Sequence, residues 1–330
     1  MKKSTLLVVL LAAALGGAVW YLEFKREKPA EDAATASKPL FGFKNEEVTA
    51  LMLTRGGETL RVERGGAAWR ITQPVDAAAD EGAVEGLLGS VSFARISKTI
   101  AVTPPGSADA LKAFGLDAPA IALEMKLKSG ATHRLRLGAK DFTGGNVYAL
   151  ADGARDVALV PADVLSNSDK PVLEFRDRRI AVFDEENLVR MRMKNEHGIL
   201  VAAKNAEGKW IVSEPVAMKG REVESERMFN ALREARAEAI LDSPTAADRA
   251  RLGRPSVEVE LSAKDGSATK VEFSAGKGDV YARSSIGPML YKVARTTVDA
   301  LNFKPADIVK KDEPKATETP KEENPTNKQN

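Results

Sequence analysis

The sequence contains no cysteine and only two histidines among its 330 residues. The absence of cysteine excludes disulfide bonds, thiolate nucleophiles, cysteine-bound metals and a lipid attached to an N-terminal cysteine. His133 and His197 lie in different halves of the chain, without the spacing of a helical zinc motif. We interpret His133 as an outward-facing residue on the polar face of a strand and His197 as part of a turn. The sequence therefore predicts no catalytic residue, no metal site and no cofactor.

A strong charge of one sign is also missing. Lysine and arginine number 49 and aspartate and glutamate number 47, so the formal net charge is only +2. Such a balance produces no global field that attracts nucleic acid, and we predict no nucleic-acid partner. The hydrophobic fraction of 43% is ordinary for a globular protein. A chain of this length has room for about two domains.

One long hydrophobic run lies near the N-terminus. Residues 4–22 carry no charge and have the length that crosses a bilayer. A Trp-Tyr pair stands at the end of the run, where aromatic rings favour the headgroup layer. We assign residues 1–24 to a transmembrane anchor. The alternative is a cleaved signal peptide, since the small residues 16–18 suit a cleavage site.

The regions that flank the body are polar. A short tail before a lone apolar segment is typical of an exported protein, so we expect a single-pass protein of the bacterial inner membrane with its body in the periplasm. Residues 25–42 are charged and rich in alanine and proline, which predicts a flexible linker. Residues 310–330 hold no apolar residue larger than alanine, and we expect this tail to be disordered.

The body of the chain contains an internal repeat. Residues 43–100 align with residues 183–241 when one residue is inserted, and a fainter similarity continues beyond them. A repeat of this kind indicates one module used twice. We expect repeat unit 1 at residues 43–180 and repeat unit 2 at residues 181–309. The clearest matched pairs are Trp69 with Trp210 and Pro74 with Pro215.

Each unit is expected to have an α+β fold, with a mainly antiparallel sheet and packed helices. Alternating segments at residues 48–54 and 59–63 flank a Gly-Gly turn, which predicts a hairpin. Residues 80–91 then place apolar side chains at helical spacing, with Asp80 as the N-cap. The alignment pairs Leu87 and Leu88 with Met228 and Phe229, and Glu81 and Glu85 with Glu222 and Glu226. We interpret these glutamates as helix-surface charges near a helix N-terminus, where the dipole favours acids.

The later part of each unit predicts a short helix and a second hairpin. Gly115 and Gly253 follow short helical segments, in the position where glycine ends a helix. The hairpins at residues 121–138 and 257–276 alternate polar and apolar residues in both arms. Two further short strands and a short helix complete each unit.

Several of these motifs together resemble a known family. They are the Trp-Arg-Ile segment at residues 69–71 with Pro74, the phrase FGLDAP at residues 114–119, and the run at residues 173–183. With the N-terminal apolar segment, they resemble the bacterial domain-of-unknown-function family DUF4340. The resemblance implies an envelope protein often encoded beside ABC-type transport proteins similar to gliding-motility components. It implies no catalytic residue.

Two groups of residues are candidates for binding. Arg176, Arg178 and Arg179 form a basic cluster between the units, which predicts docking onto an acidic partner or lipid headgroups; the alternative is a solvated linker with weak ion pairs. Trp69 and Trp210 suit either ligand-stacking platforms or duplicated core anchors. We favour core anchors, each before a strand-ending proline, because a specific site rarely needs two copies.

Two functional hypotheses follow. The first is a non-catalytic, membrane-anchored envelope protein that binds protein partners and is accessory to an ABC-type transport or motility complex. The second is a periplasmic enzyme or ligand-binding protein that acts on glycan, peptide or lipid at the junction of the units. The second requires a deep cleft lined by acids with perturbed pKa values.

Overall fold

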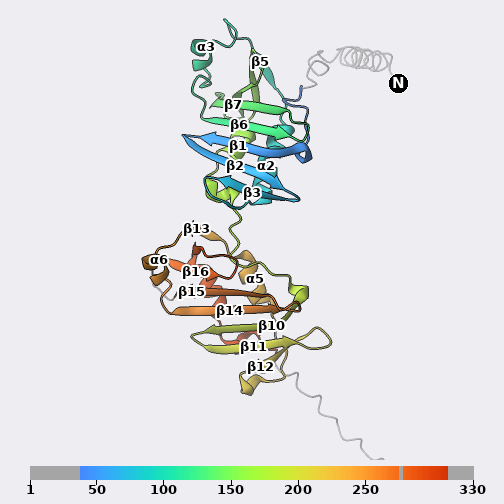
Figure 1. Cartoon of the computed structure of the whole chain (residues 1–330), viewed down its shortest axis with the longest axis vertical. Coiled ribbons are helices and arrows are strands. Elements are labelled where there is room, and N and C mark those ends of the chain that lie inside the picture. The colour runs from blue at the N-terminus through green and yellow to red at the C-terminus, as the bar shows by residue number, and fades with distance from the viewer. Residues whose placement is uncertain (1–37, 275–277, 311–330) are drawn as a thin grey trace, which may run out of the picture. The chain divides into compact units, whose positions relative to one another are not determined.

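The computed structural model describes residues 38–274 and 278–310. The chain divides between Asp177 and Arg178 into two compact units, called unit 1 and unit 2. In Figure 1 unit 1 runs from blue to yellow-green and unit 2 from yellow to red. The sequence alignment placed this division at residue 180.

The predicted anchor, the predicted C-terminal tail beyond residue 310 and most of the predicted linker lie outside the described residues. Within 38–274 and 278–310, no helix is long and apolar enough to span a membrane. Residues 38–42 were assigned to the linker, but they pack on unit 1. The backbone N–H of Leu40 donates to the carbonyl of Ala94 at 2.9 Å, and Phe41 packs against the core.

Unit 1 is built on one antiparallel sheet with the strand order β4-β3-β2-β1-β6-β7-β8-β9-β5. Its strands are β1 (Val48–Arg55), β2 (Glu58–Gly65), β3 (Ala68–Gln73), β4 (Ala77–Ala78), β5 (Lys98–Ile100), β6 (Ile121–Leu127), β7 (Thr132–Lys140), β8 (Asn146–Ala151) and β9 (Val157–Pro161). Its α-helices are α2 (Glu81–Ser92), α3 (Ala108–Lys112) and α4 (Asp163–Ser168).

The period of the apolar residues explains how this sheet and its helices pack. Alternate residues of β6 are buried, and α2 buries the side chains one turn apart, from Val84 to Val91. These two faces share one core, to which Trp69 also belongs. Asp80 caps α2 as predicted, because its carboxylate accepts from the backbone N–H of Ala83 at 2.9 Å. A smaller cluster around Leu111 and Leu150 lies under α3.

Unit 2 repeats this topology in a sheet with the order β12-β11-β10-β14-β15-β16-β17-β13. Its strands are β10 (Leu188–Asn195), β11 (Gly198–Lys204), β12 (Trp210–Glu214), β13 (Ala237–Leu241), β14 (Pro255–Ala263), β15 (Ala268–Ser274), β16 (Val280–Ser284) and β17 (Leu290–Val293). Its α-helices are α5 (Glu226–Glu234), α6 (Ala246–Ala250) and α7 (Arg295–Leu301).

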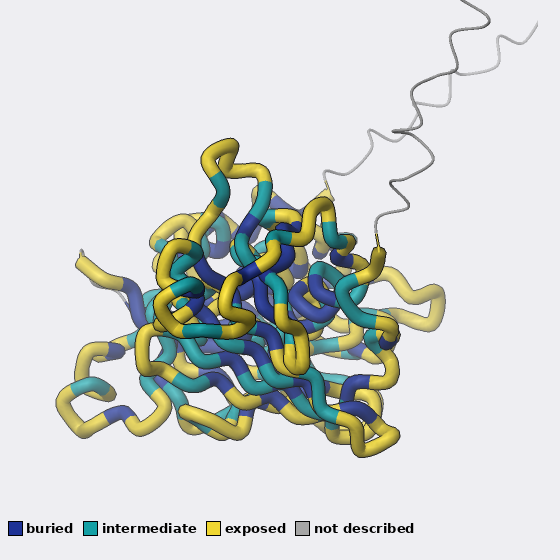
Figure 2. The backbone as a smooth tube through the Cα atoms, turned by 90° about the horizontal axis from the view of Figure 1, so that it is seen from above, coloured by how far each residue is buried: buried dark blue, intermediate teal, exposed yellow. Residues whose placement is uncertain are grey.

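The two sheets confirm the expected α+β class and the tandem repeat. Strand order is the same in both units, except that unit 1 adds β4 at one edge. Both sheets also carry an irregularity at the same place, between Val48 and Ala50 in β1 and between Leu188 and Arg190 in β10. Figure 2 shows the pattern that the sequence predicts, with buried positions inside the strands and exposed positions in the connecting loops.

The sequence alignment holds over the long helix of each unit but fails in the segment just before it. Backbone N–H groups of Ala79 and Val223 donate to the carbonyls of Trp69 and Trp210, at 3.1 and 2.8 Å. Glu222 is therefore equivalent to Ala78, three positions before its aligned partner. Unit 2 has extra residues around a short 3-10 turn, η4 (Val216–Met218), and this insertion is offset by α5, which has 9 residues where α2 has 12.

The correspondence of the helical residues is therefore the one that the sequence predicted. The backbone bonds after the helices match, since Ile96 donates to Lys38 in unit 1 and Ala237 donates to Arg178 in unit 2. Leu88 then matches Phe229, and both are buried. Glu85 matches Glu226, but Glu85 accepts a hydrogen bond from Trp69, whereas Glu226 is exposed.

The interpretation of His133 is also wrong. Its ring does not face outward with the polar residues of β7, but lies half-buried against Phe43 and Phe41, with ring centroids 5.4 and 5.0 Å away. The reason is the segment at residues 38–43, which packs on unit 1. A sequence interpretation that treats this segment as linker leaves His133 without the neighbours that cover it.

Candidate functional site

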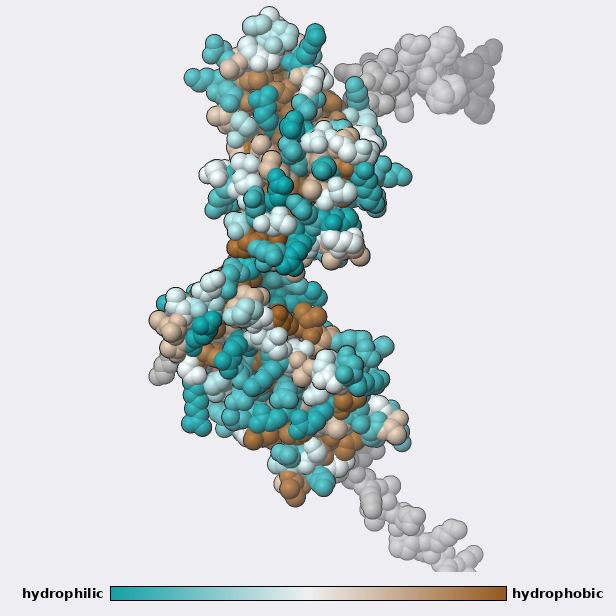
Figure 3. Space-filling model, viewed as in Figure 1, coloured by the Kyte–Doolittle hydropathy of each residue, from teal (hydrophilic) through white to brown (hydrophobic). Residues whose placement is uncertain are grey.

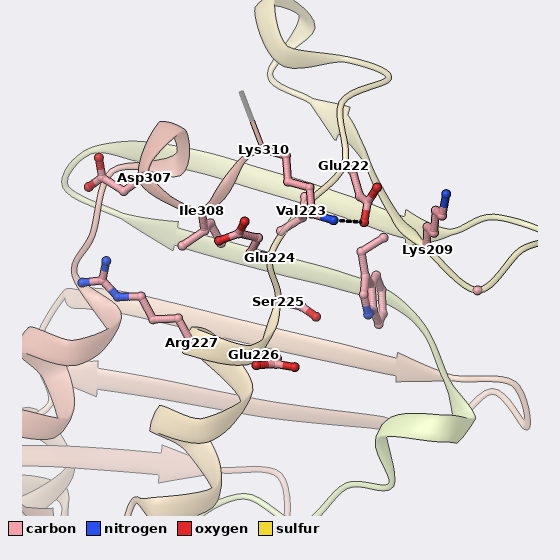
Figure 4. Close-up of a pocket in the computed structure, with 12 residues that line it drawn as sticks. Lys209, Glu222, Val223, Glu224, Ser225, Glu226, Arg227, Asp307, Ile308 and Lys310 are labelled. Atoms are coloured by element: carbon pink, nitrogen blue, oxygen red, sulfur yellow. Dashed lines mark hydrogen bonds and ion pairs between the residues drawn. The ribbon is translucent and has the colours of Figure 1, made fainter. Parts of the chain in front are cut away.

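A cleft of about 630 Å³ in unit 2 lies beside Trp210. We call it the Trp210 cleft. β12, the segment that leads into α5, the first turn of α5 and the turn η5 (Pro305–Ile308) contribute its walls (Figure 4). Its lining residues are Gly208, Lys209, Trp210, Glu222, Val223, Glu224, Ser225, Glu226, Arg227, Asp307, Ile308 and Lys310.

Trp210 belongs to the apolar wall of the cleft and packs on Phe229, which is buried in the core behind it. The ring of Trp210 meets the edge of Phe229, with centroids 5.6 Å apart and an interplanar angle of 63°. The ammonium of Lys204 lies 5.3 Å from the centroid of the Trp210 ring. Edge-to-face pairs and cation–π contacts fix the orientation of an indole ring as well as stabilising it. Trp210 is therefore held rigidly where it borders the cleft.

Backbone pairing supports the base of the cleft. The N–H of Val223 donates to Trp210, and the N–H of Glu224 donates to Ile308 at 2.7 Å. The side chains of Val223 and Ile308 are buried in the core of unit 2. The segment before α5 is thus fixed between β12 and η5, and the polar side chains that follow it are displayed from a rigid base.

Charges of both signs surround this base. Glu222 and Lys310 form an ion pair at 2.6 Å, visible as the dashed contact in Figure 4. The hydrogen bond from Lys310 holds the pKa of Glu222 below its usual value, and the same bond raises the pKa of Lys310. Both groups are therefore ionised near neutral pH, so Glu222 does not supply a proton. The other charged lining residues are Lys209, Glu224, Glu226, Arg227 and Asp307.

Ser225 is the polar lining residue with the least exposure. It occupies the N-cap position of α5 but is only 7% exposed and makes no side-chain capping bond. Its hydroxyl hydrogen-bonds to no other residue among those described. Its oxygen is not one of the buried polar atoms that lack a partner among the described residues, so this hydroxyl is open to the cleft that it lines and is available to a ligand there.

The equivalent region of unit 1 is built differently. The indole N–H of Trp69 donates to Glu85 at 2.7 Å, and Arg64 donates to the same carboxylate oxygen at 2.5 Å. The Arg64 guanidinium also lies 4.3 Å from the centroid of the Trp69 ring. Glu85 is therefore a structural acceptor and not the helix-surface charge that its position in the sequence suggested.

Some of the lining charges of unit 2 have small counterparts in unit 1. Matched backbone hydrogen bonds place Ala78 at the position of Glu222, and the alignment of the two tryptophans places Ala68 at that of Lys209. Other lining acids of unit 2 are matched by acids, namely Glu224 by Asp80 and Asp307 by Glu174. The rim of unit 2 therefore carries additional charges on a framework that both units share.

The junction arginines lie away from this cleft. Arg176 belongs to unit 1, where it is buried and its backbone pairs with Ala79. Arg178 accepts from the N–H of Ala237 through its carbonyl, and Arg179 pairs with Arg236, both within unit 2. Arg178 is half-buried and Arg179 is exposed. The structure therefore assigns the three residues to two units and brings none of them to the Trp210 cleft.

The predicted structural anchors occupy equivalent places. Trp69 and Trp210 are 2% and 5% exposed and belong to the main core of their own unit. Pro74 directly follows β3 and Pro215 directly follows β12, each after a cis peptide bond. Sequence reasoning found these pairs, but it missed the acceptor Glu85 and the cleft. The signal in the sequence that could have indicated the cleft is the difference between the segment before α2 and the segment before α5.

The described residues contain no group of three or more histidine, aspartate or glutamate side chains placed to hold a metal ion.

The fold and the cleft define a two-unit α+β protein with a duplicated sheet and one specialised copy. Residues 69–255 and 210–316 match the family model described as "Domain of unknown function (DUF4340)". The chain belongs to this family, and the two matches begin at the equivalent tryptophans. No curated protein and no solved structure matches the chain.

Proposed function

We propose that the protein is a membrane-anchored binding protein of the bacterial envelope, accessory to an ABC-type transport or motility complex. Residues 4–22 would hold it in the inner membrane, with both units in the periplasm. The Trp210 cleft of unit 2 would bind a short segment of a partner polypeptide. The proposal assigns no catalytic step to the chain.

The observation that carries the proposal is the divergence between Trp69 and Trp210. In unit 1 the N–H of Trp69 is satisfied by Glu85, which Arg64 also binds. In unit 2 the equivalent Glu226 is an exposed residue that lines a cleft of about 630 Å³ beside Trp210, and the ring of Trp210 packs on Phe229. A duplicated framework that changes at one place, from internal contacts to a charged cleft, is the pattern expected of a copy that acquired a partner.

The chemistry of the cleft suits a polypeptide. A peptide offers apolar side chains to the Trp210 wall, and its amides can bond the hydroxyl of Ser225. Charged side chains of either sign find partners on the rim, since the rim carries both acids and bases. The low pKa of Glu222 favours a binding role over general-acid chemistry, because that carboxylate stays ionised.

The location and the class of partner rest on the sequence. The apolar run at residues 4–22 supports the anchor, and the family resemblance supports a link to ABC-type transport components. These two expectations make the partner a membrane or periplasmic component of such a complex. They also state where the partner must be sought.

Site-specific photo-crosslinking in intact cells tests the proposal. A photoreactive residue is placed at Lys209 or at Asp307 in the full-length chain, on two sides of the cleft. The matched control positions are Ala68 and Glu174, which occupy the equivalent places in unit 1. We expect adducts with one component of an ABC-type complex from the unit 2 positions and not from the controls.

A second variant shows whether the adduct depends on the cleft. Glu226→Arg reverses one rim charge on an exposed residue and should reduce the adduct several-fold without unfolding unit 2. Adducts from Lys209 that match those from Ala68, or a yield unchanged in Glu226→Arg, would overturn the assignment of the cleft. Turnover of a glycan, peptide or lipid by the purified chain would overturn the non-catalytic assignment.

A further inference from the structure

Two phenylalanines of unit 1 are far more exposed than is usual for such large apolar side chains. Phe93, directly after α2, is 81% exposed, and Phe142, in the turn between β7 and β8, is 99% exposed. Single exposed apolar residues are common, but a group of them at one place marks an interaction surface. On the face shown in Figure 3, hydrophilic residues predominate and hydrophobic ones form small groups.

A continuous series of contacts joins these two phenylalanines. Phe93 and Pro161 line one shallow hollow of about 290 Å³. Pro161 pairs with Asn146 in the ladder between β8 and β9. The N–H of Asn146 donates to Asp141 at 3.2 Å, and Phe142 is the next residue. Both aromatic side chains therefore lie at the same end of the sheet.

The N-terminal segment of the described chain reaches the same end. The N–H of Ile96 donates to the carbonyl of Lys38 at 2.9 Å. The hydroxyl of Ser97, the next residue, donates to Asn146 at 3.4 Å. Residue 38 thus lies beside the turn that carries Phe142. The chain that leads from unit 1 to the apolar run at residues 4–22 departs from this end.

The length of that chain limits how far unit 1 can be from the run. Residues 23–37 separate the apolar run from Lys38. These 15 residues can span at most about 50 Å, the length of a fully extended chain. A bilayer that holds residues 4–22 would therefore lie within that distance of this end of unit 1.

The charges around the two phenylalanines complement anionic lipid. Lys38, Arg95, Lys98 and Lys140 are all exposed at this end. Two acids lie nearby, Asp141 and Asp163; Asp141 is engaged by hydrogen bonds from Thr143 and Asn146. Basic residues beside exposed aromatic or aliphatic ones are the composition of protein surfaces that lie in the headgroup layer.

We propose that this end of unit 1, called the Phe93–Phe142 surface and formed by those two residues with Lys38, Arg95, Lys98 and Lys140, rests on the surface of the bilayer. The rings of Phe93 and Phe142 enter the headgroup layer, and the four basic side chains contact lipid phosphates. The inference rests on the proposed membrane anchor, but it adds an orientation. Unit 1 is held against the membrane by its fold as well as by its tether.

The absence of cysteine makes a labelling experiment direct. Thr143→Cys places a fluorescent label beside Phe142, and Ser129→Cys places it in the turn at the opposite end of β7. Each full-length variant is reconstituted into vesicles of phosphatidylcholine and phosphatidylglycerol that contain a headgroup-linked nitroxide quencher. We expect several-fold stronger quenching at position 143 than at position 129. Quenching at 143 should fall in vesicles without phosphatidylglycerol and at high salt.

The double variant Phe93→Ser/Phe142→Ser provides the decisive comparison. Both side chains are exposed, so the substitutions leave the core of unit 1 intact, and quenching at 143 should fall to the level of position 129. Equal quenching of the two labels in protein that floats with the vesicles would overturn the bilayer contact and leave the anchor standing. Protein that does not float with the vesicles would overturn both. Shielding at 143 that depends on protein concentration in detergent would instead identify a second copy as the occupant.

Discussion

The indole of Trp69 donates to a carboxylate that an arginine also binds, whereas the indole of Trp210 packs on a phenylalanine beside an open cleft. Both tryptophans lie in the first two residues of an equivalent strand, and both accept a backbone hydrogen bond from the segment before the long helix. The framework around them is therefore the same. The difference teaches that the two units diverged at a few side chains around the tryptophans, whereas the order of strands in the sheet stayed the same.

The largest expected effect tests what the tryptophans share. Trp69→Ala and Trp210→Ala each remove a buried indole from the core of its unit and should lower the free energy of unfolding by about 3–5 kcal/mol. Urea denaturation of the full-length chain measures the loss, and hydrogen exchange should locate it in the unit that carries the substitution. Val216→Ala, at a residue 83% exposed, is the control and should have little effect. A loss below about 1 kcal/mol at either tryptophan would show that it is not a core anchor.

The next test concerns the difference between the two indoles. Trp69→Phe keeps an aromatic ring but removes the donor to Glu85, leaving a partly buried carboxylate with fewer hydrogen bonds. We expect a loss of about 1.5–3 kcal/mol, as is usual for bonds to charged groups. Trp210→Phe removes no such bond and should cost less than about 1.5 kcal/mol. Equal losses in paired urea titrations would contradict the contrast drawn here between the two units.

A third contrast lies on the sheet. Glu272 of β15 is only 6% exposed and binds both Lys270, at 2.7 Å, and Arg283, whereas Arg136 occupies the equivalent place in unit 1. Burial raises the pKa of Glu272, but the hydrogen bonds from Lys270 and Arg283 outweigh it, so the pKa lies below its usual value. Glu272→Gln should lower the free energy of unfolding at neutral pH by about 1–2 kcal/mol.

The pH dependence follows from that direction. Because the pKa of Glu272 is lower in the folded state, its stabilising contribution is present at neutral pH and is lost as the pH falls through the folded value, below about 4.3. Unfolding measured across acid pH should therefore show a shallower loss of stability in Glu272→Gln than in the unchanged protein. Parallel pH profiles of the two proteins would rule out this carboxylate as a source of the acid sensitivity.

The smallest effect concerns the start of the long helix. Asp80 caps α2 through Ala83, whereas the equivalent Glu224 is exposed and caps nothing in α5. Asp80→Ala should cost about 1 kcal/mol, and Glu224→Ala should stay within about 0.5 kcal/mol. Thermal unfolding of the two variants checks the difference. A cost at Glu224 as large as that at Asp80 would show that both helices are capped alike.

Much of the framework was predictable because its signals are local. Strands that alternate every second residue, a Gly-Gly turn at residues 56–57 and the cap at Asp80 each depend on a few neighbouring residues, and the structure has all of them. The repeat itself was visible because Trp69 and Trp210 begin equivalent strands. These features need no knowledge of what lies across the core.

The site was not predictable because its contacts are not local. The alignment pairs Glu85 with Glu226 correctly, but it does not show that Glu85 accepts from Trp69 and Arg64 while Glu226 lines a cleft. The turn η4 and the shorter α5 change the segment before the helix, and sequence spacing alone does not show where such a change is absorbed. His133 was misplaced for a related reason, since the segment that covers it begins before the first strand.

The irregularity shared by β1 and β10 bears on the order in which these differences arose. Both strands step out of register after their first residue, opposite equivalent partner strands β6 and β14. A bulge retained at one place in two copies belonged to the single ancestral module, because independent insertions would scatter along the strands. The contacts of Glu85 and Glu226, by contrast, differ between the copies and so diverged after the duplication. The distorted first strand is therefore inherited from the single module, whereas the surroundings of the two tryptophans changed in one copy or in both.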